Sequence, residues 1–266
     1  MLVNGGAPPE QAVVARPAVK SARRTVDVLE ALAGSGHGQT LSELQRELQL
    51  PKSSLHGLLQ TLMDCGWVEA SPQGTVYRIG LRALRLGTSY LDNDAITRAA
   101  GPLLVQLRNE LDETIHLGRI DGSNIVYLAS QESPHHIRTT SRIGRRLPAY
   151  ATALGKILLA MRSDEEVDAL LPERLEKLTP ATVDDRTRLH LELDDARAKG
   201  YSFERGQNTP SLGGFAVAVP GHHPSTDALS CSLPLTRLDD QHSARIVAAL
   251  THRADELGHL VRSNGW

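Results

Sequence analysis

Residues 40–80 constrain the fold more than any other part of the chain, because two short helices and a hairpin follow one another there with almost no connecting sequence. Thr40 and Glu43 have the spacing of a capping box, in which each side chain bonds the other residue's backbone N–H at the start of a helix. The apolar residues that follow share one helical face and are Leu41, Leu44 and Leu48. The pattern therefore predicts a short helix that begins after Thr40.

A second helix is expected directly afterwards. Pro51 suits the first position of a helix, where its missing N–H is not needed. The apolar face of this helix comprises Leu55, Leu58, Leu59, Leu62 and Met63. The opposite, polar face comprises Lys52, Ser53, Ser54, His56 and Gln60. Such a face suits insertion into the major groove of DNA, with its first residues on phosphates and His56 and Gln60 on base edges.

A hairpin and a preceding helix complete the predicted domain. Residues 67–79 contain two alternating stretches around a turn with Pro and Gly, which is typical of a hairpin wing. Residues 22–33 have a helical pattern. We therefore expect a winged helix–turn–helix domain at residues 20–80. Its further candidate DNA contacts are Arg23, Arg24 and Arg78.

Short helix pairs with a hairpin also occur in ordinary α+β cores and in protein-docking modules, so the pattern alone leaves these alternatives open. The local charge favours DNA to a modest extent. Residues 16–91 carry nine Lys and Arg against six Asp and Glu, a net charge of +3, whereas the whole chain has a net charge of −2.

The composition argues against several other classes of protein. Aromatic residues make up only 3%, too few for a stacking surface that binds single-stranded nucleic acid. Cys65 and Cys231 form no CxxC pair, so we expect neither a disulfide framework nor a zinc site. No segment approaches the roughly 20 apolar residues that span a membrane, and residues 1–19 are expected to be a disordered tail rather than a signal peptide. The expectation is a cytoplasmic protein that needs no membrane, metal or cofactor.

A linker and a second domain are expected after the wing. Residues 81–94 read as a linker helix, at whose end Asn93-Asp94 can cap a further helix, and residues 95–266 form the second domain. Its expected strands are Thr114–Ile120, Ser123–Ala129, Ile137–Ile143, Tyr201–Arg205, Gly214–Val219 and Ala228–Leu233. Its expected helices lie within residues 95–111, 147–162, 164–171, 184–199 and 239–262. This order predicts a largely antiparallel sheet flanked by helices, hence an α+β fold.

Catalytic signals are few in this second domain. It has no Gly-rich phosphate loop, no HExxH and no GxSxG. Cys231 can be considered as a nucleophile, but it lies mid-strand on the apolar side, which favours a buried structural cysteine. His135-His136 and His222-His223 suggest a metal, yet neighbouring residues on a strand point to opposite faces, so neither pair chelates readily by itself.

Two features indicate a pocket for a small molecule. Alternation along residues 228–233 places Ser230 and Ser232 on one face of the sheet, where they either line a polar cavity or face solvent. The small residues of 147–156 enter a helix whose free backbone N–H groups favour an anion. The alternative for this second feature is a tight loop–helix junction without a ligand.

Taken together, these pieces resemble the IclR (isocitrate lyase regulator) family of bacterial transcription factors, from about Ala18 to the last helix. The residues that carry the resemblance are Arg24–Glu30, Leu50–His56, Tyr77–Gly80, Leu147–Ala160 and Gly200–Ser202. The resemblance implies an N-terminal winged helix–turn–helix, a linker helix used in dimerisation and a GAF-like C-terminal domain that binds a small organic effector.

Carried over by motif, the resemblance implies an effector site. Its residues would be Leu147, Ala153, Leu154, Glu204, Ala216, Ser230 and Ser232. The chain departs from the family at three places: Gly57 replaces a common Arg and removes a phosphate contact, residues 204–213 form a longer segment, and Ala216 replaces a frequent Cys.

The sequence therefore predicts a DNA-binding transcriptional regulator without enzymatic activity, controlled by a small organic acid. A homodimer or homotetramer would read a pseudo-palindromic operator, with the linker residues Leu81, Leu84 and Leu91 as a dimer seam. The rival hypothesis is an enzyme that acts on a small carboxylate in the same pocket, through Cys231 or a Ser/His pair. The chain offers no base–orienter arrangement for such a group.

Overall fold

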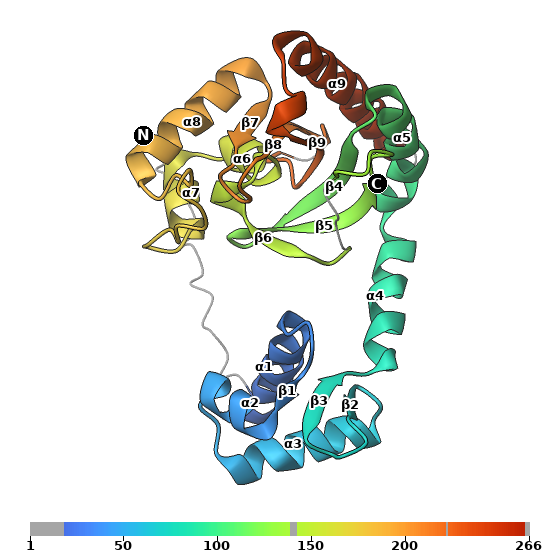
Figure 1. Cartoon of the computed structure of the whole chain (residues 1–266), viewed down its shortest axis with the longest axis vertical. Helices are drawn as coiled ribbons and strands as arrows, with labels where there is room; N and C mark the ends of the chain where they lie inside the picture. Colours follow the sequence, from blue (N-terminus) through green and yellow to red (C-terminus); the bar gives the residue numbers. More distant parts are fainter. Residues whose placement is uncertain (1–18, 139–142, 222, 264–266) are drawn as a thin grey trace, which may run out of the picture. The chain divides into compact units, whose positions relative to one another are not determined.

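The computed structural model describes residues 19–138, 143–221 and 223–263. The chain divides into two compact units, of which the first runs to Ser89 and the second begins at Tyr90 (Figure 1). The division falls within the helix α4 (Leu81–Asn93). The predicted tail, residues 1–19, lies outside the described residues except for Val19, which precedes the first helix.

The first unit is a three-helix domain with a small antiparallel sheet in the strand order β1-β3-β2. Its elements are α1 (Lys20–Gly34), β1 (Gln39–Thr40), α2 (Leu41–Leu48), α3 (Lys52–Asp64), β2 (Val68–Ala70) and β3 (Val76–Ile79). The predicted capping box is confirmed, because the Thr40 hydroxyl accepts from the Glu43 N–H and the Glu43 carboxylate from the Thr40 N–H. Pro51 is the N-cap of α3 rather than its first helical residue.

The core of this unit combines the predicted stripes of α2 and α3 with the hairpin and with two residues of α1, Val28 and Leu32, that the sequence did not single out. Its buried residues are Val28, Leu32, Leu44, Leu55, Leu59, Leu62, Val68 and Tyr77. The strand β1 is a feature that the sequence analysis missed. It pairs with β3 through Gln39 and Thr40 and so adds a third strand to the wing.

The second unit is built on a six-stranded antiparallel sheet in the order β6-β5-β4-β9-β8-β7. The strands are β4 (Thr114–Asp121), β5 (Asn124–Gln131), β6 (Arg146–Pro148), β7 (Ser202–Arg205), β8 (Leu212–Ala218) and β9 (Asp227–Pro234). The helices are α5 (Ala95–Leu111), α6 (Ala153–Ala160), α7 (Asp164–Leu170), α8 (Arg186–Lys199) and α9 (Asp240–Ser263), with 3-10 turns η1 (Ala149–Ala151) and η2 (Leu235–Arg237). The predicted α+β class is confirmed.

Each face of this sheet packs against its own helices (Figure 1). Alternation along the strands sends Ile115, Leu117, Leu229 and Cys231 to the face covered by α5 and α9. The other face meets α6 and α8, and its central positions are small or polar. Across this face His116, Ser230 and Ala216 lie opposite one another on β4, β9 and β8. The sheet therefore presents a polar strip beneath α6.

The predicted strand Ile137–Ile143 is wrong at the residues that the structure describes, since Ile137, Arg138 and Ile143 lie in bends, coil or turn. Residues 139–142 lie outside the described residues. The strand in this region is β6, which pairs with β5. Its three residues are too few to alternate visibly, whereas Ile137 and Ile143, which suggested a buried strand, are exposed.

The predicted dimer seam on the linker needs one correction. Leu81 and Leu84 are 68% and 62% exposed, but Leu91 is half-buried and packs against the apolar cluster that α5 and α9 form with the sheet. Leu91 therefore belongs to the C-terminal core. None of the described helices is long and apolar enough to cross a membrane.

Candidate functional site

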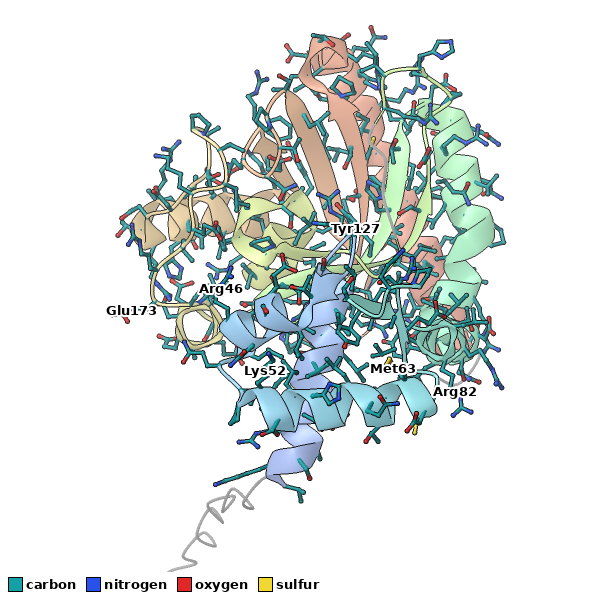
Figure 2. The ribbon with its side chains drawn as sticks, turned by 60° about the horizontal axis from the view of Figure 1, so that its bottom comes forward. Arg46, Lys52, Met63, Arg82, Tyr127 and Glu173 are labelled. Carbon is teal, nitrogen blue, oxygen red and sulfur yellow. The ribbon has the colours of Figure 1, made fainter. Side chains whose placement is uncertain are left out.

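The polar face of α3 is largely open to solvent. Lys52, Ser53, His56 and Gln60 are exposed, and Figure 2 shows Lys52 near the start of α3. Ser54 is half-buried, and its hydroxyl accepts a hydrogen bond of 3.4 Å from the Arg24 guanidinium on α1. The structure thus keeps this polar face away from the core.

Several of the candidate DNA contacts already have partners within the domain. The Gln60 amide donates to the Asp64 carboxylate at 2.9 Å, and Arg23 donates to Asp27 at 2.9 Å. These bonds would have to exchange for bonds to DNA, which lowers the net gain of each contact.

The wing and the middle of α3 complete this surface. Arg78 on β3 is exposed and lies opposite Glu69 of β2 in the strand register. Gly57 is exposed on the polar face, and a Cβ there would meet nothing within 4 Å. The position therefore has room for a Cβ.

A narrow cavity of about 40 Å³ lies in the second unit between the polar strip and the start of α6. Six of the seven predicted effector residues line it: Leu147, Ala153, Leu154, Glu204, Ser230 and Ser232. Ala216 does not line it, because its side chain is fully buried in the core beneath α6. The cavity brings together strands β6, β7 and β9, which are far apart in the sequence.

Sequence reasoning missed the other residues that line this cavity. They are Tyr127, Arg145, Thr152, Asn208, Thr209, Leu212, Gly213 and Gly214. Arg145 immediately precedes β6, the strand that the sequence placed elsewhere, so its position depended on an unrecognised pairing. Thr152 did carry a detectable signal, since it stands three residues before Gly155 at a helix start.

The start of α6 is held by an unusually close backbone contact. A Cβ on Gly155 would lie 2.1 Å from the carbonyl oxygen of Ala149, so only glycine fits there. The Thr152 hydroxyl caps the helix by accepting from the Gly155 N–H at 3.0 Å. The Gly155 N–H is thus already bonded, so the candidates for the anion-binding N–H groups expected at this helix start are those of Ala153 and Leu154.

Glu204 brings a buried carboxyl group to the same cavity. Burial raises its pKa to about 7, although it accepts a hydrogen bond of 2.8 Å from the Gln207 N–H. Lys156 donates to the Gln207 side chain at 2.6 Å and to Glu192. Burial lowers the pKa of Lys156, and the attraction of Glu192 opposes this shift. At neutral pH Glu204 is therefore protonated in a large fraction of molecules, which reduces its repulsion of an anion.

Beneath the cavity lies a histidine that the sequence analysis did not single out. His116 is fully buried, stacks on Tyr127 with ring centroids 4.6 Å apart, and shares a hydrogen bond of 2.9 Å with the Ser130 hydroxyl. Burial lowers its pKa to about 3, and the nearby charge of Arg145 acts in the same direction. His116 is therefore neutral and supports the Tyr127 ring that lines the cavity.

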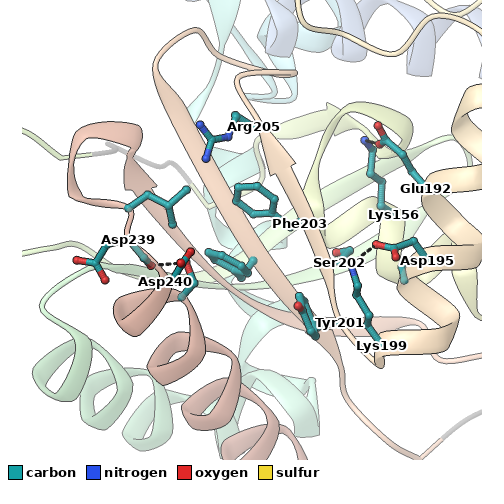
Figure 3. Close-up of a pocket in the computed structure, with 14 residues that line it drawn as sticks. Lys156, Glu192, Asp195, Lys199, Tyr201, Ser202, Phe203, Arg205, Asp239 and Asp240 are labelled. Carbon is teal, nitrogen blue, oxygen red and sulfur yellow. Dashed lines mark hydrogen bonds and ion pairs between the residues drawn. The ribbon is translucent and has the colours of Figure 1, made fainter.

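A larger groove of about 440 Å³ lies elsewhere in this unit, between α8, the edge strand β7 and the start of α9. Figure 3 shows Asp195 and Lys199 on one side of it, Asp239 and Asp240 on the other, and Phe203 between them. None of the predicted effector residues lines this groove. We favour the smaller cavity as the effector site, despite its small volume, because Ser230, Ser232, Arg145 and the start of α6 line it and place a few polar groups among apolar walls.

The candidate catalytic and metal groups have structural explanations. Cys231 is fully buried on the apolar face of the sheet, and burial raises the pKa of its thiol well above the ordinary value, which disfavours the nucleophilic thiolate. His135 and His136 are exposed, and His222 lies outside the described residues. Within the described ranges, no group of three or more His, Cys, Asp and Glu is placed to hold a metal ion.

Both units of the chain match models of one known protein family. The model of the bacterial transcriptional regulator IclR C-terminal domain matches residues 88–259, and the IclR helix-turn-helix model matches residues 21–72. The chain belongs to the IclR family of transcriptional regulators. The six-stranded domain is thus the IclR C-terminal domain. The first unit, the head, contains the helix-turn-helix DNA-binding domain of the family.

Among curated relatives, the HTH-type transcriptional regulator XynR of Escherichia coli (strain K12) is 32% identical over 230 residues, which cover 86% of this chain and 91% of XynR. A crystal structure of an IclR-family regulator from Alicyclobacillus acidocaldarius is 25% identical, covers 92% of this chain and 100% of its own, and has a TM-score of 0.82. An IclR homolog from Microbacterium hydrocarbonoxydans, complexed with 4-hydroxybenzoate, is 25% identical over 91% of this chain and 99% of its own, with a TM-score of 0.75.

Proposed function

We propose that this IclR-family regulator binds a pseudo-palindromic operator as a homodimer or homotetramer, and that a small organic acid in the cavity beneath α6 controls this binding. The observation that carries the proposal is that Ser230, Ser232, Arg145 and the first residues of α6 line one cavity. The homolog from Microbacterium hydrocarbonoxydans, which was crystallised with an aromatic carboxylate, supports an acid as the ligand class.

Each group around the cavity has a role in this proposal. The N–H groups of Ala153 and Leu154 and the two serine hydroxyls donate to the carboxylate, and Arg145 supplies a positive charge at the rim. Leu147 and Leu154 form the apolar walls. Glu204, whose pKa is raised to about 7 and which is therefore protonated in a large fraction of molecules at neutral pH, repels the anion less and can bond a polar group at the far end of the acid.

The enzyme hypothesis receives no support from this arrangement. A nucleophilic mechanism needs a reactive group within hydrogen-bond reach of a base. Cys231 lies on the opposite, apolar face of the sheet from the cavity, and the neutral His116 shares its hydrogen bond with Ser130 rather than with a serine of the cavity. We therefore propose that the domain binds its acid without converting it.

Calorimetry on the double variant Ser230→Ala with Ser232→Ala tests the site. The full-length protein is titrated with a panel of monocarboxylates from acetate and glyoxylate to 4-hydroxybenzoate. Because a hydrogen bond to a charged group contributes roughly 1.5–3 kcal/mol, we expect the double variant to bind the best acid at least about tenfold more weakly. Ser243→Ala, in the larger groove, is the matched control and should bind normally. Normal binding by the double variant, or loss of binding in Ser243→Ala, would contradict the assignment.

A further inference from the structure

One arginine in the second unit ties the end of the linker helix to the centre of the sheet. The Arg119 guanidinium on β4 donates to the Tyr90 hydroxyl at 2.7 Å, to the Asp94 carboxylate at 2.7 Å and to the Asp227 carboxylate at 2.8 Å. Tyr90 lies in the last turn of α4, Asp94 caps α5 by accepting from the Thr97 N–H, and Asp227 begins β9. A single side chain thus joins two helix ends to two central strands.

The two carboxylates of this cluster are largely buried, so their bonds to Arg119 are difficult to replace by water, whereas Tyr90 is 52% exposed and its bond is open to solvent. The Arg119 side chain is 23% exposed, and that of Asp227 is 2% exposed. Burial opposes the charge on Arg119, but hydrogen bonds to Asp94 and Asp227 more than offset it, so the pKa of the guanidinium lies above its ordinary value. Removing the arginine would leave a buried carboxylate without its counter-ion, which is costly.

The residue before Arg119 touches the wall of the effector cavity. Gly118 points to the opposite face of β4, because successive residues of a strand alternate. A Cβ at Gly118 would lie only 2.8 Å from Cδ1 of Leu154, and Leu154 lines the cavity. The wall of the cavity therefore rests directly on the backbone of β4, with no side chain in between.

We propose that Arg119 is the positioning residue through which the cavity controls the linker helix. A ligand that displaces Leu154 pushes on β4 at Gly118, and Arg119, on the other face of the same strand, passes that shift to Tyr90 and Asp94. The inference rests on the proposed function, for which it names the route of regulation. It requires two arrangements of β4 that ligand binding populates differently.

A second arginine–carboxylate pair, next to the start of β4, provides a matched control. Arg237 donates to the Glu113 carboxylate at 2.6 Å, and Glu113 precedes the first residue of β4. This pair resembles that of Arg119 and Asp227, since the arginine is partly exposed and the carboxylate is buried. Arg237 has none of the contacts to Tyr90 or Asp94 that Arg119 makes. A variant at Arg237 thus costs comparable stability without releasing the linker.

Hydrogen–deuterium exchange of the full-length protein tests the proposal without ligand or DNA. Amides in the last turn of α4 should exchange roughly three- to tenfold faster in Tyr90→Phe and Arg119→Gln, because each variant loses hydrogen bonds that oppose local opening. Arg119→Lys should restore part of the protection. Arg237→Gln should leave exchange in this turn unchanged. Equal effects of Arg119→Gln and Arg237→Gln there would show a general loss of stability and overturn the proposal.

The route from the cavity is tested by combining variants. Leu154→Ala should accelerate exchange in the last turn of α4, and it should add nothing further in an Arg119→Gln background, since the two sites then share one path. Additive effects, or no effect of Leu154→Ala on this turn, would overturn the proposal. The exchange measurement involves neither acid nor operator. If it contradicts the role of Arg119, the proposed function is unaffected. If the serine variants bind the acid normally, the exchange result is unaffected.

Discussion

Glu204 shows how one residue's surroundings make its contribution depend on pH. The pKa of this carboxyl is raised from 4.5 to about 7 by burial. Between these values the folded state holds a proton that the unfolded chain has released, so stability falls as pH rises through this window. The shift corresponds to a loss of about 3 kcal/mol from the C-terminal domain between about pH 4.5 and pH 7.

Urea denaturation from pH 5 to pH 8 checks this expectation. Glu204→Gln should remove the fall in stability that the wild type shows as pH rises towards 7. His116, whose pKa is lowered to about 3 by burial, acts in the opposite sense below pH 6.5 but is common to both proteins, so their difference isolates Glu204. The exposed Glu173 (Figure 2) supplies the control Glu173→Gln, which should follow the wild type. Parallel curves for Glu204→Gln and wild type would show that this carboxyl is ionised as usual.

At the scale of the element, α3 makes a prediction about DNA. Lys52 at its start should neutralise a phosphate, so Lys52→Ala should weaken binding to every duplex and reduce the salt slope by about 1. Gln60→Ala should change which sequences are preferred, because an amide can read a base edge once it leaves Asp64. Selection from randomised duplexes, followed by gel-shift titration at several salt concentrations, measures both effects. Lys177→Ala, an exposed lysine of the other unit, is the control.

The linker helix makes a second prediction at this scale. Leu81 and Leu84 are exposed, so changing both to Ser should weaken an oligomer that buries them while leaving the unfolding temperature of the C-terminal domain unchanged. Leu91→Ser should lower the unfolding temperature of the C-terminal domain and leave the oligomer intact, because Leu91 packs on the C-terminal core. Light scattering and thermal unfolding of each variant distinguish the two outcomes. A wild-type monomer at micromolar concentration would refute the seam altogether.

The elements that the sequence predicted well are those with long, regular patterns. The stripes of α2 and α3 and the strands β4 and β9 each carry several consistent signals. The two-residue β1 and three-residue β6 are too short to show a repeated alternation, and they exist because β3 and β5 offer them a pairing edge. Their existence is thus a property of the tertiary fold.

The candidate site likewise contains some residues that the sequence predicted and others that it could not predict. Ser230 and Ser232 could be placed on one face by alternation alone, and the resemblance supplied Leu154 and Glu204. Tyr127 and Arg145 could not be found, because their nearness to the serines depends on the pairings of β5 with β4 and β6. Ala216 shares a face with Ser230, yet its small side chain stays in the core. A shared face does not by itself give access to the cavity.

At the scale of the whole molecule, the two units have separate apolar cores. The buried cluster of the head shares no residue with the two clusters of the C-terminal domain. We therefore expect two unfolding transitions in calorimetry. Leu59→Ala in the head and Ile157→Ala in α6 should each cost about 2–5 kcal/mol and lower one transition only. A single transition that both variants shift equally would show that the units unfold as one.

The glycine contact at the start of α6 has a consequence for how this regulator can diversify. Any mutation of Gly155 drives a side chain into the backbone at Ala149, so this position at the start of α6 is barred from change. The opposite wall, with Tyr127, Arg145 and Asn208, is made of side chains that single substitutions can exchange. Descendants of this chain would therefore keep the backbone at the start of α6 and change the cavity through the side chains around it.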